Sequence, residues 1–126
     1  MVVDKKSRKI ICTTFTNGKR HDFRLFKESK VYVLKEIQLN TDTGYQGIAK
    51  IHANSVLPKK KTKKKPLTSE DKAFNCAISS QRVLNEHVIG FIKRFKIVAD
   101  RYRNRRKRFG LRFNLIAGIC NFESNL

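Results

Sequence analysis

Apolar positions recur with a helical period between residues 74 and 95. On a wheel of about 100° per residue with Arg82 at zero, the apolar side chains fall on one arc from roughly 180° to 340°. They are Phe74, Ile78, Leu84, Val88, Ile89, Phe91, Ile92 and Phe95. A narrow opposite stripe carries Asn75, Ser79, Arg82, Glu86 and Lys93. The pattern predicts a long amphipathic helix that ends at about Phe95 or Val98.

The first part of the chain has the pattern of strands and one short helix. Val2-Val3 and RKIICTTF (8–15) are rich in β-branched residues, and the DKKS between them predicts a hairpin turn. Asp22 is placed to cap a short helix, DFRLFKES, with apolar positions at 23, 25 and 26. A third strand is expected within 30–41, ending in EIQLNT, and the glycines of DTGYQG then open a sharp turn. Asp42 is therefore expected at the C-terminal end of that strand.

A lysine-rich segment divides the chain. Residues 57–67 place six lysines between two prolines, and such a segment cannot build a core, so it predicts a solvated linker or insertion. Thr68 and Asp71 then approximate a capping box at the start of the periodic helix. After it come a basic cluster, DRYRNRRKR, and a closing apolar helix, GLRFNLIAGICNF.

This order of elements predicts one α/β domain over 1–126, since a chain of this length has room for a single modest core. Its expected parts are 1–56 (strands, first helix and the Asp42 strand), the linker at 57–67, and 68–126 (the Glu86 helix, the basic cluster and the C-terminal helix). Cys12, Cys76 and Cys120 lie far apart in apolar runs, which predicts reduced core thiols and a reducing cytosol. No apolar run reaches the ~18 residues of a membrane span, and we expect a cytoplasmic protein.

The charge balance points to a polyanionic partner. Twenty-nine Lys and Arg against ten Asp and Glu give a net charge of +19, for which nucleic acid is the default partner and an anionic membrane the weaker alternative. The candidate DNA-binding residues are Arg82, Lys93, Lys59, Lys60, Lys61, Lys63, Lys64, Lys65, Arg101, Arg103, Arg105 and Arg106.

Asp42 and Glu86 are the candidate catalytic and metal-binding residues. Two carboxylates aimed at one point repel each other unless a cation lies between them, and magnesium is the natural cation for hard oxygen ligands. In a basic protein this suggests metal-assisted chemistry on a phosphodiester, with Arg82 and Lys93 holding phosphates. The open alternative is a solvated helix face with intrahelical ion pairs.

The series HDFRLFKES, DTGYQG, R-x3-E-x6-K and YRNRRKRFGLRFNLIAGICNF resembles the C-terminal two thirds of the catalytic domain of insertion-sequence DDE transposases, also called DDE superfamily endonucleases. The resemblance implies an RNase H-like fold in which two Asp and one Glu bind divalent metal, Mg or Mn, to cut and join DNA at transposon ends and targets. By this similarity Asp42 matches the second Asp and Glu86 the Glu. Arg82 and Lys93 match the basic residues of the signature, while Ser79 stands at its tyrosine position.

The resemblance also implies that the first catalytic Asp is missing. In the family this Asp ends a strand and two more strands precede the first helix, whereas here only one strand lies between Asp4 and Asp22. Asp4 is therefore expected in a turn, with the first strand and its Asp upstream of Met1. The expectation is a truncated transposase that is inactive alone, either a decayed remnant or the second frame of a split gene.

Several alternatives stay open. The chain could be a non-catalytic basic nucleic-acid-binding protein, a non-functional remnant that never folds, or a partner for an upstream-frame fusion or a homo-oligomer, associated with the bacterial nucleoid. His21, His52 and His87 share no metal spacing, and His87 lies off the polar stripe. We expect the Tyr45 side chain to pack against its neighbours, close enough to Asp42 to contact a bound substrate.

Overall fold

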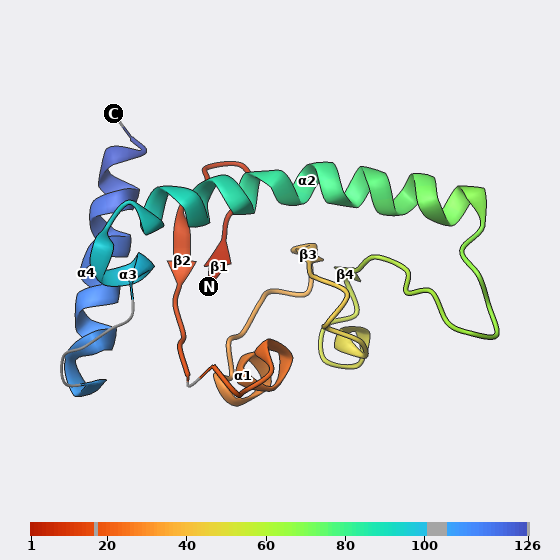
Figure 1. Cartoon of the computed structure of the whole chain (residues 1–126), viewed down its shortest axis with the longest axis horizontal. Helices are drawn as coiled ribbons and strands as arrows, with labels where there is room; N and C mark the ends of the chain where they lie inside the picture. The colour runs from red at the N-terminus through yellow and green to blue at the C-terminus, as the bar shows by residue number, and fades with distance from the viewer. Residues whose placement is uncertain (17, 101–105, 126) are drawn as a thin grey trace. The chain divides into compact units, whose positions relative to one another are not determined.

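The computed structural model describes residues 1–16, 18–100 and 106–125 (Figure 1). They form two compact units. The terminal unit comprises Met1–Phe15 and Val83–Leu126, and the central unit comprises Thr16–Arg82. One helix, α2 (Ser69–Lys93), contributes residues to both units. Together the elements make a mixed α/β structure with two separate two-stranded sheets in the described residues.

The terminal unit begins with the predicted hairpin. Strand β1 (Val2–Val3) pairs antiparallel with β2 (Ile10–Cys12), so β2 is shorter than the predicted run to residue 15. Asp4 lies in the turn, as predicted, and its carboxylate accepts hydrogen bonds from the backbone N–H and the hydroxyl of Ser7. These bonds lower the pKa of Asp4, so the carboxylate is engaged in closing the turn.

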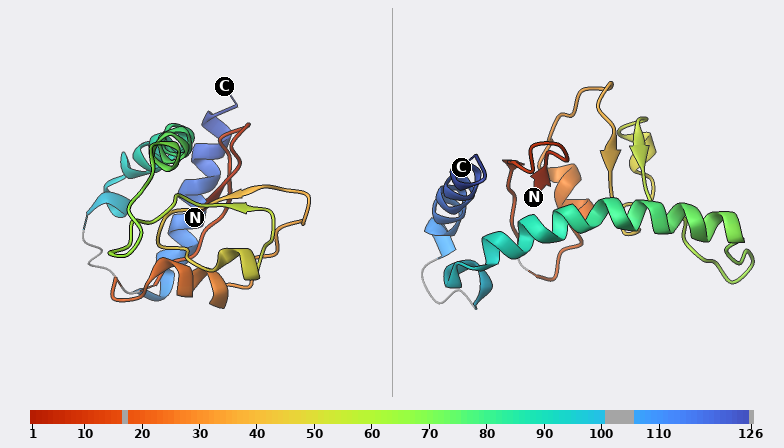
Figure 2. Two further views of the ribbon diagram at one scale, coloured as in Figure 1. Left: turned by 90° about the vertical axis from the view of Figure 1, so that its right-hand side faces the viewer. Right: turned by 90° about the horizontal axis from the view of Figure 1, so that it is seen from above.

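Helix α4 (Phe109–Glu123) is the predicted C-terminal apolar helix, and it packs along β2 (Figures 1 and 2). Asn121 donates to the Ile10 carbonyl at 2.8 Å and accepts from the Ile10 N–H at 2.7 Å. Asn114 hydrogen-bonds Thr13 from the same side of the helix. The side chains buried in this core are Ile10, Val88, Ile92, Ile116, Ala117 and Cys120.

Gly110 is required where α4 begins. A Cβ at this position would overlap the ring of Phe15. That ring meets Phe109 edge-on, with 5.2 Å between centroids, and lies 6.3 Å from Phe113. The glycine therefore lets the end of the first segment pack directly on the helix.

The central unit contains α1 (Asp22–Glu28), β3 (Leu39–Asn40), a 3-10 turn η1 (Ile48–Lys50) and β4 (Ser55–Val56). The prediction that Asp22 caps α1 is wrong. The N-cap is His21, whose Nδ1 accepts from the N–H of Phe23, and Asp22 is the first residue of the helix. Strand β3 pairs in parallel with β4, a strand that the sequence did not predict.

Helix α2 begins as predicted. The Thr68 N–H donates to the Asp71 carboxylate at 3.2 Å, and the Asp71 N–H donates to the Thr68 hydroxyl at 3.1 Å, which is a reciprocal capping box. The helix ends at Lys93, and a short helix α3 (Lys96–Ala99) follows it. A 3-10 turn η2 (Arg106–Arg108) precedes α4. None of the helices in the described ranges has the length and apolarity to cross a membrane.

Candidate functional site

Asp42 lies at the C-terminal end of β3, as the sequence predicts. The Thr41 N–H makes a sheet bond to the Val56 carbonyl at 2.9 Å, and the chain then turns, with the Tyr45 N–H donating to the Asp42 carbonyl at 2.9 Å. Gly47 completes the turn in a left-handed conformation, φ 88°, which favours glycine. The Asp42 side chain is 53% exposed, so its carboxylate faces solvent at the strand end.

The contacts of the Asp42 carboxylate are concentrated on one oxygen. Oδ1 accepts from the Thr43 N–H at 2.6 Å and from the Thr43 hydroxyl at 3.1 Å. Arg82 Nη1 lies 3.2 Å from the same oxygen. Within residues 1–16, 18–100 and 106–125, no hydrogen bond or ion pair reaches Oδ2. One oxygen is thus oriented by the protein, and the other is open.

Arg82 links β3 to α2 inside the central unit. Its guanidinium is 34% exposed, and the neighbouring Gln81 accepts a hydrogen bond from Asn40 at 3.3 Å. The ion pair with Asp42 was not predicted, because the sequence pattern assigned Arg82 to phosphate alone. The structure therefore places an arginine of the polar stripe on the predicted catalytic Asp.

Glu86 and Lys93 lie on the same helix as Arg82, four and eleven residues further on. Both are exposed. They belong to the terminal unit, whereas Asp42 belongs to the central unit. The approach of the Asp42 and Glu86 carboxylates, expected at roughly 4 to 8 Å for a shared metal ion, stays a prediction.

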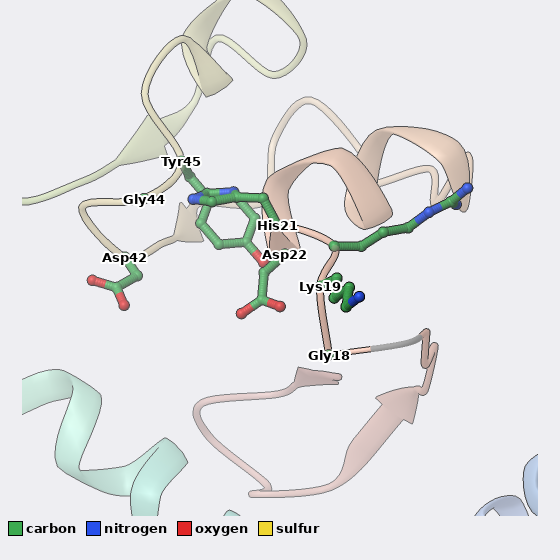
Figure 3. A pocket seen from close by; sticks show the side chains of 8 residues that line it. Gly18, Lys19, His21, Asp22, Asp42, Gly44 and Tyr45 are labelled. Carbon is green, nitrogen blue, oxygen red and sulfur yellow. The ribbon is translucent and has the colours of Figure 1, made fainter.

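A pocket of about 420 Å³ lies next to Asp42 in the central unit (Figure 3). Its lining residues are Gly18, Lys19, Arg20, His21, Asp22, Asp42, Gly44 and Tyr45. Gly44 allows the close approach of the two loops, because a Cβ there would lie 3.2 Å from His21 Cε1. The sequence analysis missed Asp22 as a pocket residue since it assigned that side chain to capping. The sequence pattern gives no other sign of its place in the pocket.

Tyr45 is half-buried behind this pocket. Its ring lies 5.4 Å from the ring of Phe23 and 6.0 Å from that of Phe26, so it packs as predicted. Burial raises the pKa of the Tyr45 phenol above 10.0, and the charges of Asp22 and Asp42 raise it further. In Figure 3 the Tyr45 side chain extends toward Asp22.

The predicted DNA-binding cations differ in their surroundings. All six linker lysines are exposed, and Lys59 also forms an ion pair with Asp71 at 2.5 Å. Arg101, Arg103 and Arg105 lie outside the described residues, and Arg106 begins η2.

The described histidines and cysteines have no metal-binding arrangement. No group of three or more His, Cys, Asp or Glu residues is poised to hold a metal ion in the part of the chain that the structure describes. His52 is buried, with Nε2 2.7 Å from the Ile37 carbonyl, and His87 is exposed. The three cysteines are free thiols, but the prediction that all three lie in the core is wrong, because only Cys120 is buried and Cys76 is exposed.

Comparisons with known proteins give one consistent relationship. The family model described as DDE superfamily endonuclease matches residues 1–121. The chain is 47% identical over 123 residues to the "Probable transposase for insertion sequence element IS702" of Microchaete diplosiphon. That match covers 98% of this chain and 45% of the relative, so the chain spans less than half the length of the relative. No solved structure matches.

Proposed function

Because the chain belongs to the DDE superfamily endonucleases, in the group of insertion-sequence transposases, we propose that it serves DNA transposition by metal-dependent cutting and joining of DNA strands. The observation that carries the proposal is the Asp42–Arg82 ion pair. Arg82 lies one turn before Glu86 on α2. The arginine that contacts Asp42 is therefore a helical neighbour of Glu86.

Asp42 and Glu86 are the proposed metal ligands. Members of this family use divalent metal, and Mg²⁺ or Mn²⁺ is bound by carboxylate oxygens of the kind that Asp42 presents. The Thr43 N–H fixes Oδ1, which leaves Oδ2 free to coordinate an ion, and such outer contacts orient a ligand. The bound ion would activate the attacking hydroxyl and stabilise the leaving oxygen.

The basic residues of the stripe are proposed to bind DNA phosphates. Arg82 already contacts an anionic oxygen, and a guanidinium binds phosphate by the same paired geometry. Lys93 ends α2, two turns after Glu86, and supplies a point charge. The arginines of the cluster at 101–106 and the lysine-rich segment would extend this cationic surface along the DNA backbone.

We also propose that the two small sheets belong to an RNase H-like fold in which β3 carries Asp42 and α2 carries Glu86. The order of elements along the chain, with the hairpin first, then α1 and then β3, supports this assignment. Such a protein would work in the bacterial cytoplasm, close to the nucleoid. A crystal structure of the chain on DNA with Mn²⁺ would test it, since both carboxylates should then contact the ion.

The proposed site can be tested by titrating the 126-residue protein with Mn²⁺. Electron paramagnetic resonance detects binding as a loss of the free-ion signal. We expect Asp42→Asn and Glu86→Gln each to weaken binding by about tenfold or more, because each removes a charged ligand oxygen. Glu36→Gln is the matched control, since Glu36 is an exposed carboxylate away from the pocket lining. Equal Mn²⁺ affinities in all four proteins would overturn the metal assignment.

A non-catalytic DNA-binding role is the second candidate, because a charge of +19 supports DNA binding without either carboxylate. It predicts that Asp42→Asn and Glu86→Gln leave Mn²⁺ affinity and DNA affinity unchanged apart from a small gain due to added positive charge.

A further inference from the structure

The lysine-rich segment is fixed to α2 at its first lysine. The Lys59 N–H donates to Asn75 Oδ1 at 2.8 Å, and Asn75 Nδ2 donates to the Lys59 carbonyl at 2.9 Å. The Lys59 ammonium lies 2.5 Å from Asp71 Oδ1 and 5.6 Å from the centroid of the Phe74 ring. Phe74 and Asn75 lie three and four residues after Asp71, one helical turn on, so the three side chains form a single docking face for Lys59.

The charge of Lys59 is already compensated. Its hydrogen bond lowers the pKa of Asp71, which keeps the carboxylate ionised, and the Asp71 side chain is only 15% exposed. Because the pair is complete within the protein, the Lys59 ammonium has no need of an external anion.

The other five lysines are presented differently. Lys60, Lys61, Lys63, Lys64 and Lys65 are exposed and form no ion pair with any residue in 1–16, 18–100 or 106–125. The backbone of Thr62 and Lys65 closes the tip, with reciprocal N–H to carbonyl bonds of 3.3 Å. The Thr62 hydroxyl accepts from the Lys65 N–H at 3.1 Å. The green trace between β4 and α2 in Figure 1 is thus anchored to α2 at Lys59 and turns back at Thr62 to Lys65.

We propose that residues 60–65 form a loop that binds the phosphate backbone of double-stranded DNA, and that Lys59 is a positioning residue that holds this loop on α2. The inference rests on the proposed function only in taking DNA as the partner. An anionic membrane fits less well, because residues 59–65 contain no apolar side chain to insert beside the headgroups. Exposed ammonium groups alone can bind duplex DNA, since each contact with a phosphate releases a counterion condensed on the DNA.

The test is the binding of a random-sequence duplex, followed by fluorescence anisotropy over a series of salt concentrations. Lys63→Gln should lower the slope of log affinity against log salt by about 0.9, as expected for one lost phosphate contact. Lys59→Gln should leave the slope unchanged while lowering affinity about threefold to tenfold, because the freed loop must be ordered on binding. Asn75→Ala should do the same, although it removes no charge.

Each outcome decides a different point. A slope change for Lys59→Gln equal to that for Lys63→Gln would show that Lys59 contacts DNA, which overturns its positioning role. An unchanged slope of log affinity against log salt for Lys63→Gln would show that the loop does not contact DNA, although the rest of the protein could still bind it. Tighter binding to phosphatidylserine vesicles than to the duplex at equal salt would assign the loop to membranes. Loss of helical circular dichroism in Asn75→Ala would leave Lys59→Gln as the deciding variant.

Discussion

At the scale of single residues, Arg82 would oppose a metal ion at the proposed site on Asp42. Its guanidinium lies 3.2 Å from Oδ1, so any metal ion on the same carboxylate has a positive charge as a close neighbour. Arg82→Gln should therefore raise Mn²⁺ affinity by about threefold to tenfold, since two like charges near a partly exposed site repel by about 1 kcal/mol. Mn²⁺ titration detected by electron paramagnetic resonance measures this. Lys50→Gln makes the same change in net charge at an exposed site, and an equal rise in that control would contradict the local role of Arg82.

Tyr45 provides a titration test of the pocket. Burial, Asp22 and Asp42 all disfavour the phenolate, so the folded pKa lies above 10.0. Because the unfolded chain ionises first, stability should fall as the pH rises from 10.0 through the folded pKa. In a Tyr32→Phe, Tyr102→Phe background, ultraviolet absorbance reports Tyr45 alone. Asp22→Asn should shift its titration to lower pH, and an unshifted curve would place Asp22 away from the hydroxyl.

Residue types in the sequence were enough to predict Asp42 at a strand end, but not the partner of each side chain. His21 and Asp22 both have acceptors that suit the same free amides of α1, and only the backbone conformation decides that His21 receives the bond. The pairing of Arg82 with Asp42 depends on two segments forty residues apart, for which the wheel of α2 holds no information.

At the scale of elements, the start of α2 depends on its capping box. Thr68→Ala removes the acceptor of the Asp71 N–H, so we expect a loss of about 1 kcal/mol in the free energy of unfolding. Urea denaturation monitored by circular dichroism measures it. Thr14→Ala, at an exposed site outside the helices, is the control and should change stability by less than about 0.5 kcal/mol. Equal losses would show that the box does not stabilise the helix.

The periodicity of α2 predicted its buried face well because a helix repeats its contacts every turn. Val88 and Ile92, near the middle of the apolar arc, and Ile78, toward one side of it, are buried, whereas Phe74 near the start of the helix is 42% exposed. Ile89 and Phe91, at the margins of the arc, are 38% and 40% exposed. In contrast, β4 has only two residues and pairs in parallel with a distant strand, so neither periodicity nor a turn signal reveals it.

At the scale of the whole molecule, the proposed site holds two carboxylates, and the resemblance to DDE transposases implies a third. We expect the 126-residue chain alone neither to nick nor to join DNA with Mg²⁺ or Mn²⁺, because two carboxylates would hold the metal ions loosely. Displacement of a reacting group by about 1 Å can cost a hundredfold in rate. Gel assays on end-labelled DNA test this. Nicking that is lost in both Glu86→Ala and Asp4→Ala would show that Asp4 completes the site, despite its bonds to Ser7.

The +19 charge predicts salt-sensitive DNA binding with or without catalysis, so DNA binding alone does not test the catalytic role.

The pairing of Asn121 with Ile10 has a consequence for aggregation. The edge of β2 that faces away from β1 would otherwise present an unpaired N–H and C=O, which are a template for a strand from another molecule. The Asn121 amide occupies both groups, and Asn114 binds Thr13 two helical turns earlier. A helix side chain satisfies the edge but cannot extend the sheet. The hairpin is thereby closed to edge-to-edge association on this side, which adds to the mutual repulsion of highly charged chains.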